Sequence, residues 1–449
     1  MKKENKQYIL SEQPVTSALI ALSVPSILTS LVTTFHNMID TYFISQLKDN
    51  TMIAAATVAL PIMVLIYALG EGLGAGAESC IGRQMGAGQN EKVKESVSTT
   101  MILACLISVV AVVFAVTGLR PVIHTFTDDL VVVEHAYRYL SILTMGSVFV
   151  VFKQVCTHLL RSNGDVQFPM KTVFLEVVIN TILNPIFMFD FGFGMKVSGV
   201  AVATVIAQGI SAVILLVRLM TQKSVLTIDW KKLRLSFEST KEIAAVGSAV
   251  FLRNGLPSLS YGLFAKSAGL FGTDYIAASG LARKAEQAAN FVIFGIAQGY
   301  QPFASYNYGA RNKQRLMSAM KQTIVFTVLY GCAVAMVFYG VPHLLMRVFT
   351  SDPVLIENGT TILKWYAVGM PIIGIYQIFA ASFQSMGKSK ISFVTSVLRQ
   401  GIIYCPLIVI LPRVLHETGF AMVQPMCDWC SALITCILVR DLMKEIKQM

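Results

Sequence analysis

The sequence predicts an all-α membrane protein with twelve transmembrane helices in two pseudo-symmetric six-helix lobes. Three observations predict this fold: apolar composition along the whole chain, an alternating pattern of Lys and Arg, and an internal repeat. Of 449 residues, 55% are hydrophobic and only 14% are charged, and the mean hydropathy is +0.64. A soluble domain carries ~25% charged residues. A bilayer, which needs about 20 apolar residues per helical crossing, accounts for this composition.

The apolar runs place the individual crossings. Each run is long enough for one helix through the bilayer, and polar or charged residues separate the runs. The predicted helices of the first half cover residues 15–45, 52–80, 97–117, 135–158, 168–189 and 197–218. Those of the second half cover residues 240–271, 275–304, 320–340, 358–384, 389–411 and 418–440.

Positive charges alternate along the segments that connect these helices. With the N-terminus inside, the inner segments hold 23 of the 36 Lys and Arg residues, and the outer segments hold only 5. Cytoplasmic segments carry an excess of Lys and Arg. We therefore expect twelve crossings of a bacterial plasma (inner) membrane, with both termini cytoplasmic. The net charge of +11 is then a topology signal and does not indicate nucleic-acid binding.

An internal repeat divides the chain into two lobes. A shift of 223 residues aligns Asp129 with Asp352 and Gly164 with Gly387, among other pairs. Six helices in each half make both halves run in the same sense, so a pseudo-two-fold axis along the membrane normal and alternating access by rocking are expected. The predicted parts are a cytoplasmic N-terminal segment (1–14), an N-lobe (15–218), a cytoplasmic connector (219–239), a C-lobe (240–440) and a cytoplasmic tail (441–449).

Several other kinds of protein are not supported. Cys427 and Cys430 form a C-x-x-C without a second such pair, so no metal site is expected. No nucleophile–base or metal-ligand constellation indicates an enzyme, and no ATP-binding module is found, so transport would depend on an ion. The basic N-terminus is followed by an apolar run without an A-x-A site, so a cleaved signal peptide is not expected. The small-residue run from Gly70 to Gly76 predicts a close helix-packing face.

Asp40 is the main candidate for chemistry in the first lobe. It lies in the outer half of the first predicted helix with no cation near it in the sequence, and Asn37, three residues earlier, is a further candidate for the same coupling-ion site. An ionisable group inside the bilayer costs roughly 2.5–3.5 kcal/mol on insertion scales and faces the bundle interior by default. Such a carboxylate could take up and release a proton as its exposure changes. A structural, hydrogen-bonded aspartate is an equal alternative.

The fifth predicted helix carries two amides on one face. Asn180 and Asn184 are four residues apart, Pro185 interrupts the helical hydrogen bonds of that turn, and Glu176 can share the same face. The amides could hydrogen-bond Asp40 or coordinate a cation. The alternative is that they hold helices together, a common role of polar residues in membranes.

Buried charges also occur in the second half and are candidates for a substrate cleft, together with Glu176. They are Arg253, Arg283, Glu286, Arg399 and Asp428. Lone charges are disfavoured in a membrane. We therefore expect Arg283 to pair with Glu286 at three residues' spacing and Arg399 to pair with Asp428 across helices. Purely structural pairing is the main alternative to a role in binding.

The chain resembles the multidrug and toxic compound extrusion (MATE) family over nearly its whole length, and the MepA-like or DinF-like bacterial branch in particular. The matching segments are Pro25 through Asp40-Thr-Tyr-Phe-Ile, Gly72-Leu-Gly-Ala-Gly-Ala, Gly82-Arg-Gln-Met-Gly-Ala-Gly, Arg161-Ser-Asn-Gly-Asp, Asn180 to Asn184-Pro185, and Gln301-Pro302 through Tyr306-Asn307-Tyr308-Gly309-Ala310.

The resemblance implies a proton or sodium antiporter that exports cationic amphipathic compounds and needs no other cofactor. It implies a coupling-ion site at Asp40 with Asn180 and Asn184, and with Tyr139 and Thr204. Some members carry Asp where this chain has Asn184, so a two-carboxylate site is absent. The sodium-coupled branch also has acids within helices 7 and 10, where this chain has only Glu242 and Glu357 at the helix edges.

Two further functions compete with drug export. A flippase or exporter of a lipid-linked or anionic metabolite should have a cationic cleft, and the C-lobe does carry several Arg residues. The acidic Asp40 and the count of twelve helices favour the exporter. We expect it to act as a monomer on a small-molecule substrate. A membrane-embedded enzyme has the least support.

Overall fold

The computed structural model describes residues 6–449 except 48, 223, 229 and 231–232, and it leaves the side chains of residues 37, 50, 258 and 259 undescribed. The described residues form helices and connecting turns, with no β-strand among them. The helices of the first half are α1 (Gln7–Ser11), α2 (Val15–Gln46), α3 (Asn50–Gly86), α4 (Asn90–Thr117), α5 (Leu119–His124), α6 (Leu130–Met145), α7 (Ser147–Ser162), α8 (Gln167–Met188) and α9 (Val197–Thr221).

The helices of the second half repeat this order. They are α10 (Phe237–Ala268), the short η2 (Gly269–Phe271), α11 (Thr273–Gly309), α12 (Lys313–Gly340), α13 (Pro342–Phe349), α14 (Pro353–Ser385), α15 (Ser389–Val397), the π-helix η3 (Leu398–Ile403) and α16 (Tyr404–Gln448). The short helices α5 and α13, which start 223 residues apart, were not expected from the sequence.

All twelve predicted crossings are present in the described part of the chain. Eight helical spans are long and apolar enough to cross a membrane, and α6 with α7, bent by 44°, makes a ninth. The span Ser389–Gln448 contains non-helical His416 (φ 54°, ψ −137°) and so holds the two predicted crossings on either side of it. The charge-bearing helices α10 and α11 are the remaining two. The protein is therefore an all-α, multi-pass membrane protein.

The fourth crossing is broken, where the sequence predicted one helix over 135–158. The break lies at Gly146, between α6 and α7. A Cβ at Gly146 would lie 2.4 Å from Val205 Cγ2 of α9. Close approach of α9 therefore requires glycine at the break.

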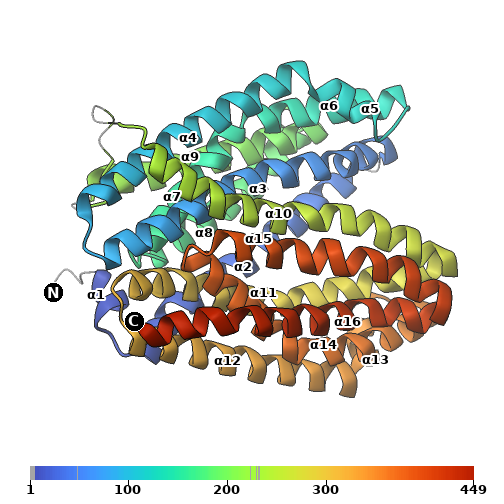
Figure 1. Cartoon of the computed structure of the whole chain (residues 1–449). Helices are drawn as coiled ribbons and strands as arrows, with labels where there is room; N and C mark the ends of the chain where they lie inside the picture. The colour runs from blue at the N-terminus through green and yellow to red at the C-terminus, as the bar shows by residue number, and fades with distance from the viewer. Residues whose placement is uncertain (1–5, 48, 223, 229, 231–232) are drawn as a thin grey trace. The chain divides into compact units, whose positions relative to one another are not determined.

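The chain folds as two compact units. Unit 1 comprises Met1–Gln7 and Leu28–Asn254, and unit 2 comprises Tyr8–Ile27 and Gly255–Met449. In Figure 1 the helices α3–α9 of unit 1 run from blue to green and the helices α11–α16 of unit 2 from yellow to red, while the part of unit 2 at residues 8–27 is blue. Helices α2 and α10 each contribute to both units. The lobe boundary at a 219–239 connector remains a prediction.

Unit 1 is held together by the predicted close-packing face on α3. A Cβ at Gly74 would lie 2.5 Å from His158 Cδ2 of α7. On the opposite side, a Cβ at Gly72 would lie 2.8 Å from the carbonyl oxygen of Gly247 in α10. Alternate glycines thus let α3 approach α7 and α10 at once, which confirms the small-residue face.

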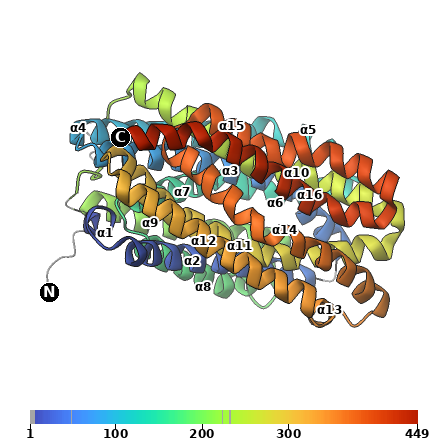
Figure 2. The same cartoon turned by 60° about the horizontal axis from the view of Figure 1, so that its bottom comes forward.

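Unit 2 is built around α14. Figures 1 and 2 both show α12, α14 and α16 alongside one another, and α14 packs on both of the other helices. Gly331 and Gly374 make the α12–α14 approach possible, since a Cβ at Gly331 would lie 2.3 Å from the carbonyl oxygen of Met370. Nearby, the rings of Phe264, Tyr275 and Phe420 pack against one another.

The repeat appears in the local structure of both units. Asp129 and Asp352 each cap a helix, and the Oδ1 of each accepts backbone N–H bonds from the second and third residues after it. Gly164 and Gly387 both have positive φ, at 82° and 71°. These are conformations that glycine adopts without steric cost. The 223-residue repeat inferred from the sequence is therefore a structural repeat.

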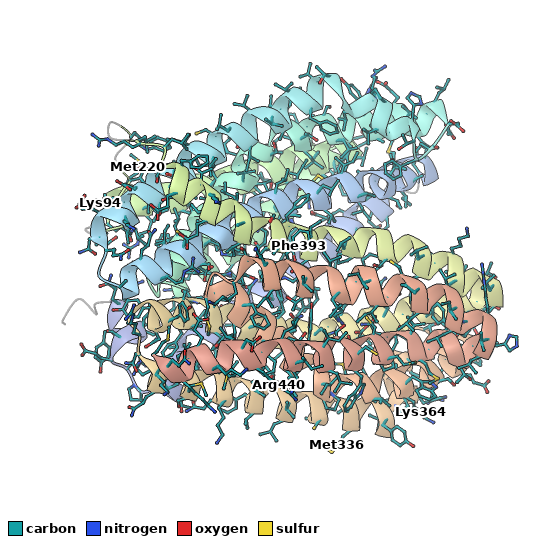
Figure 3. The ribbon with its side chains drawn as sticks, viewed as in Figure 1. Lys94, Met220, Met336, Lys364, Phe393 and Arg440 are labelled. Atoms are coloured by element: carbon teal, nitrogen blue, oxygen red, sulfur yellow. The ribbon has the colours of Figure 1, made fainter. Side chains whose placement is uncertain are left out.

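Apolar side chains cover outward-facing surfaces of the helices. In unit 2, Met336 on α12 is 69% exposed and Phe393 on α15 is 44% exposed, and both are labelled in Figure 3. Large apolar side chains exposed on many helices suit a lipid environment, where no polar outer face is needed.

Candidate functional site

Asp40 lies near the end of α2, within unit 1. Its side chain is 19% exposed, and its Oδ2 lies 3.1 Å from His36 Nε2, one helical turn earlier. His36 is itself buried. If His36 is protonated the two form an ion pair, and if it is neutral an Nε2–H can still donate to the carboxylate. The helix that presents Asp40 therefore also supplies a titratable partner.

The two predicted amides of α8 meet Asp40 directly. Asn184 Nδ2 lies 2.8 Å from Asp40 Oδ1 and 3.0 Å from Asn180 Oδ1. Asn180 Nδ2 in turn donates to Thr204 Oγ1 of α9 at 3.1 Å. Both amides are completely buried. Their spacing of four residues places them on one helix face, as the sequence predicted.

Tyr139 lies on the wall of the same site. It is half-buried on α6 and packs with the cluster of Ile44, Met188 and Val200 at the ends of α2 and α8 and the start of α9. The side chain of Asn37, the remaining predicted member, lies outside the described residues. Four α-helices (α2, α6, α8 and α9) thus contribute to one small polar site in an apolar setting.

The chemistry of this site suits a small cation. A carboxylate, amide oxygens and the Thr204 hydroxyl are oxygen donors of the kind that hard cations prefer. Asn184 Oδ1 is buried without a hydrogen-bond partner among the described groups. Such an atom can accept a cation, and the carboxylate beside it can instead take a proton. The geometry therefore fits H⁺ and Na⁺ alike.

Glu176 lies one turn before Asn180 but belongs to a different pair. Its Oε1 lies 2.7 Å from Lys153 Nζ of α7, and both side chains are buried. Lys153 also lies 3.4 Å from the Tyr67 hydroxyl of α3. The charge of Glu176 is therefore balanced within unit 1.

The predicted charges of unit 2 form one of the two expected pairs. Arg399 Nε donates to Asp428 Oδ1 at 2.7 Å, which confirms that pairing. Arg283 and Glu286 interact electrostatically, but among the described contacts no direct ion pair joins them. The Arg283 guanidinium lies over the rings of Tyr261 and Phe264, 4.3 and 4.5 Å from their centroids. Aromatic faces attract a guanidinium and draw it away from the acid.

Glu286 is buried and accepts a hydrogen bond from Asn290 Nδ2 at 3.1 Å. Arg253 falls in unit 1, where it interacts electrostatically with Glu71 of α3. The structure thus places the substrate-cleft candidates in separate groups within the two units. Their role in binding a substrate remains a prediction.

Two features of these sites were missed in the sequence. His36 stands four residues before Asp40 on a predicted helix, and that spacing is a signal that could have identified it. The π-helix Leu398–Ile403, which carries Arg399, has no comparable sequence signal, although π-bulges often occur at functional sites. A surface pocket of about 630 Å³ near Lys94 and Met220, labelled in Figure 3, lies apart from these residues.

The comparison with protein families identifies one match. The model of the MatE family matches residues 25–186 and 249–410, one segment in each half of the chain. Among curated proteins, the chain is 26% identical to the multidrug export protein MepA of Staphylococcus aureus (strain MRSA252), over 98% of this chain and 97% of that protein. It is 24% identical to MepA of Staphylococcus saprophyticus, with the same coverage.

Solved structures share the fold. A structure described as the outward-facing conformation of a multidrug resistance MATE family transporter superposes with a TM-score of 0.92 at 22% identity, over the whole of both chains. A MOP superfamily transporter from Pyrococcus furiosus, described as having a binding pocket of reverse polarity, gives the same TM-score and identity over the whole of both chains. These two similarities concern the fold.

Proposed function

Because the chain belongs to the MATE family, a family of transporters and not of enzymes, we propose that it is an ion-coupled secondary antiporter exporting drugs or toxic compounds. The observation that carries this proposal is the Asp40 carboxylate, held between His36 Nε2 at 3.1 Å and Asn184 Nδ2 at 2.8 Å. A carboxylate with these partners can exchange an ion as the protein alternates between two conformations.

The relatives support a small-molecule substrate. Proteins named multidrug export protein align with this chain from end to end. We propose cationic amphipathic compounds as the substrates, because the carboxylate of the Asp40 site attracts cations. A coupling ion bound at Asp40 neutralises this charge and so weakens binding of a cationic substrate in the same unit. Antiport requires such competition between ion and substrate.

We propose that the coupling ion is H⁺ or Na⁺ and that no other cofactor is needed. A proton would occupy Asp40 itself. Sodium would use Asp40 together with the amide oxygens and the Thr204 hydroxyl. Since amides do not titrate, a proton-coupled cycle depends on Asp40 and His36, the titratable pair of the site.

The cellular setting is also part of the proposal. The distribution of Lys and Arg supports a bacterial plasma membrane with both termini in the cytoplasm. Ser224 lies in the predicted cytoplasmic connector. A cysteine placed there, in a chain whose native cysteines are replaced, should react with a membrane-impermeant maleimide only in inside-out vesicles. Labelling in intact cells would contradict this topology. We propose that the transporter acts as a monomer.

The test of the function is transport in proteoliposomes with imposed ion gradients. Purified protein should move ethidium against its gradient when a pH or a sodium gradient is imposed separately, and Asp40→Asn should abolish the driven movement. An ethidium transport rate that changes with neither gradient would contradict ion coupling.

A second function is favoured by one observation. Unit 2 carries Arg283 and Arg399, and a relative of the same fold is described as having a binding pocket of reverse polarity. Export or flipping of an anionic or lipid-linked metabolite would use these guanidinium groups. Competition of ethidium transport by an anionic amphiphile, and its loss in Arg283→Gln, would support this alternative.

A further inference from the structure

Unit 1 contains a second group of titratable side chains, apart from Asp40. His158 of α7 lies between two acids of α3. Its Nε2 is 3.3 Å from Glu71 Oε2, and its Nδ1 lies within hydrogen-bond distance of Glu78 Oε2. His158 and Glu78 are each 2% exposed. Glu71 also accepts a hydrogen bond from Gln154 Nε2 at 2.7 Å.

The three groups lie far from Asp40 along the helices. Met52, near the start of α3, packs against Ile44, which lies one turn after Asp40 on α2. At ~1.5 Å per residue, Glu78 lies on the order of 40 Å along α3 from Met52. It is therefore near the end of unit 1 at which α3 and α7 terminate, whereas Asp40 is near the opposite end.

The hydrogen-bond geometry requires a proton in this group. A neutral imidazole has one N–H and one lone pair, so it can donate to only one of two carboxylates. Both contacts are hydrogen bonds only if the imidazole is doubly protonated or if one carboxyl group is protonated. In either case the group of three side chains holds one proton more than it would with a neutral His158 and both glutamates ionised. Without that proton, one contact brings two lone pairs together.

A second observation locates the extra proton. Glu78 Oε1 is buried and has no hydrogen-bond partner among the described groups. An ionised carboxylate with an unsatisfied buried oxygen is costly, whereas a neutral acid loses less when its carbonyl oxygen is unpaired. In the arrangement that leaves no charge on the carboxyl group with the unpaired oxygen, Glu78 Oε2–H donates to His158 Nδ1, and His158 Nε2–H donates to Glu71 Oε2.

The charged groups around the site do not replace the extra proton shared by Glu71, His158 and Glu78. Lys153 is engaged by Glu176, and Arg161 and Arg253 act on Glu71, the acid on the other side of the imidazole. The titratable and charged groups on the elements packed around this site include Tyr67 and Arg83 of α3, Lys153 and Arg161 of α7, Glu176 of α8, and Glu242 and Arg253 of α10. Helix α4, which packs on both α3 and α7, adds Glu91, Lys92, Lys94 and Glu95 near its start.

We propose that Glu71, His158 and Glu78 form a second proton-binding site of the transport cycle. This deepens the proposed function and rests on it. The proton moves when Glu78 Oε2–H gives its proton to His158 Nδ1 while His158 Nε2–H gives its proton to Glu71. One O–H and one N–H bond break, one N–H and one O–H bond form, and the total charge is unchanged. The proton has then crossed from Glu78 to Glu71, and chains of acids and histidines act in this way in membrane proteins.

The packing makes this step sensitive to conformation. A Cβ at Gly74 would lie 2.5 Å from the His158 ring, so the ring fits closely against α3. A shift of α7 against α3 changes both imidazole contacts together. Proton exchange at this site would thereby respond to any movement of α7 against α3 within unit 1 during the transport cycle.

The experiment compares driven and undriven transport by the full-length protein in proteoliposomes. Ethidium uptake driven by a pH gradient should fall at least tenfold in His158→Gln and in Glu78→Gln. Ethidium counterflow at equal pH on both sides should stay within twofold of the wild type. Glu78→Gln also keeps an N–H donor toward His158, so it tests the proposal even if His158→Gln does not fold. The matched controls are His124→Gln and Glu91→Gln, both at exposed positions.

Two results would overturn the proposal. Driven uptake within twofold of the wild type in the folded variants would show that the three groups carry no coupling proton. An equal loss of driven uptake and counterflow would show a structural role. In either case the proposed function stands if the wild type responds to the pH gradient and Asp40→Asn does not. If uptake by the wild type does not depend on the pH gradient, the transporter is not coupled to protons, and the second proton-binding site is contradicted as well.

Discussion

The residue 223 positions after Glu176 in unit 1 is Arg399 in unit 2, and each is part of a different buried ion pair. Glu176 is paired with Lys153, whereas Arg399 is paired with Asp428 and lies 5.7 Å from the centre of the Tyr376 ring. Tyr376 is also the residue 223 positions after Lys153. The two units therefore keep a buried charge pair in the same region but build it from different residues.

The comparison extends to the ion site. The position 223 residues after Asp40 is Leu263, an apolar residue that packs on the core of unit 2. In contrast, the helix-capping aspartates and the positive-φ glycines are retained in both units. The features that cap helices are thus shared, whereas these buried charged groups are not. The residues of the proposed ion site therefore belong to unit 1, while unit 2 differs in its charge and aromatic content.

The largest expected effect is at Asp40. Asp40→Asn keeps the size of the side chain and removes its titratable group, so driven ethidium efflux should fall to the level of cells without the transporter. Efflux from cells with equal expression of both proteins measures this. Leu263→Asn, at the equivalent position of unit 2, is the matched control and should retain coupling. Unchanged efflux by Asp40→Asn would mean that this aspartate is structural.

The next effect concerns the two ion pairs. Lys153→Met leaves the Glu176 charge buried and unpaired, which should destabilise the protein by about 3–5 kcal/mol. Arg399→Met should cost less, because Gln424 Nε2 still lies 3.3 Å from Asp428 Oδ1. The measurement is the unfolding midpoint of each variant in detergent. The double variant Lys153→Met with Glu176→Gln should recover most of the loss. An equal fall of the unfolding midpoint in Lys153→Met and Arg399→Met would contradict a difference between the two ion pairs.

A smaller effect is expected from the amides of unit 1. Asn184→Leu removes the N–H donor to Asp40 Oδ1, which favours the protonated acid over the charged carboxylate. The pH profile of transport in vesicles should then move to more alkaline values, because proton release needs a lower proton concentration. Asn184→Asp should give a profile with two coupled steps. Profiles that superimpose on the wild type would show that α8 does not influence the ion site.

The smallest effect tests what the units share. Asp129→Ala and Asp352→Ala each remove one helix cap with the same two backbone partners. Each substitution should reduce stability by about 1 kcal/mol and leave coupling unchanged. Thermal unfolding in detergent and driven uptake measure the two outcomes. A loss of coupling in only one variant would show that the caps are not equivalent.

The sequence by itself predicted the number of crossings and the repeat, and it placed the two amides of α8 on one face, where they could reach Asp40. Helical periodicity and the length of a bilayer crossing act locally, so the twelve apolar runs and the four-residue spacing of Asn180 and Asn184 were sufficient. The cost of lone charges in a membrane predicted that Arg399 would have a partner, and Asp428 was one choice among the buried acids.

Only the tertiary structure decided which groups meet across helices. Arg283 and Glu286 have the spacing of an ion pair, but the rings of Tyr261 and Phe264 draw the guanidinium away. The break at Gly146 arises from the approach of α9, and the contacts of His158 with Glu71 and Glu78 arise from the approach of α7 to α3. These outcomes depend on helix rotation and close packing between distant segments, which hydrophobic pattern and spacing along one chain do not specify.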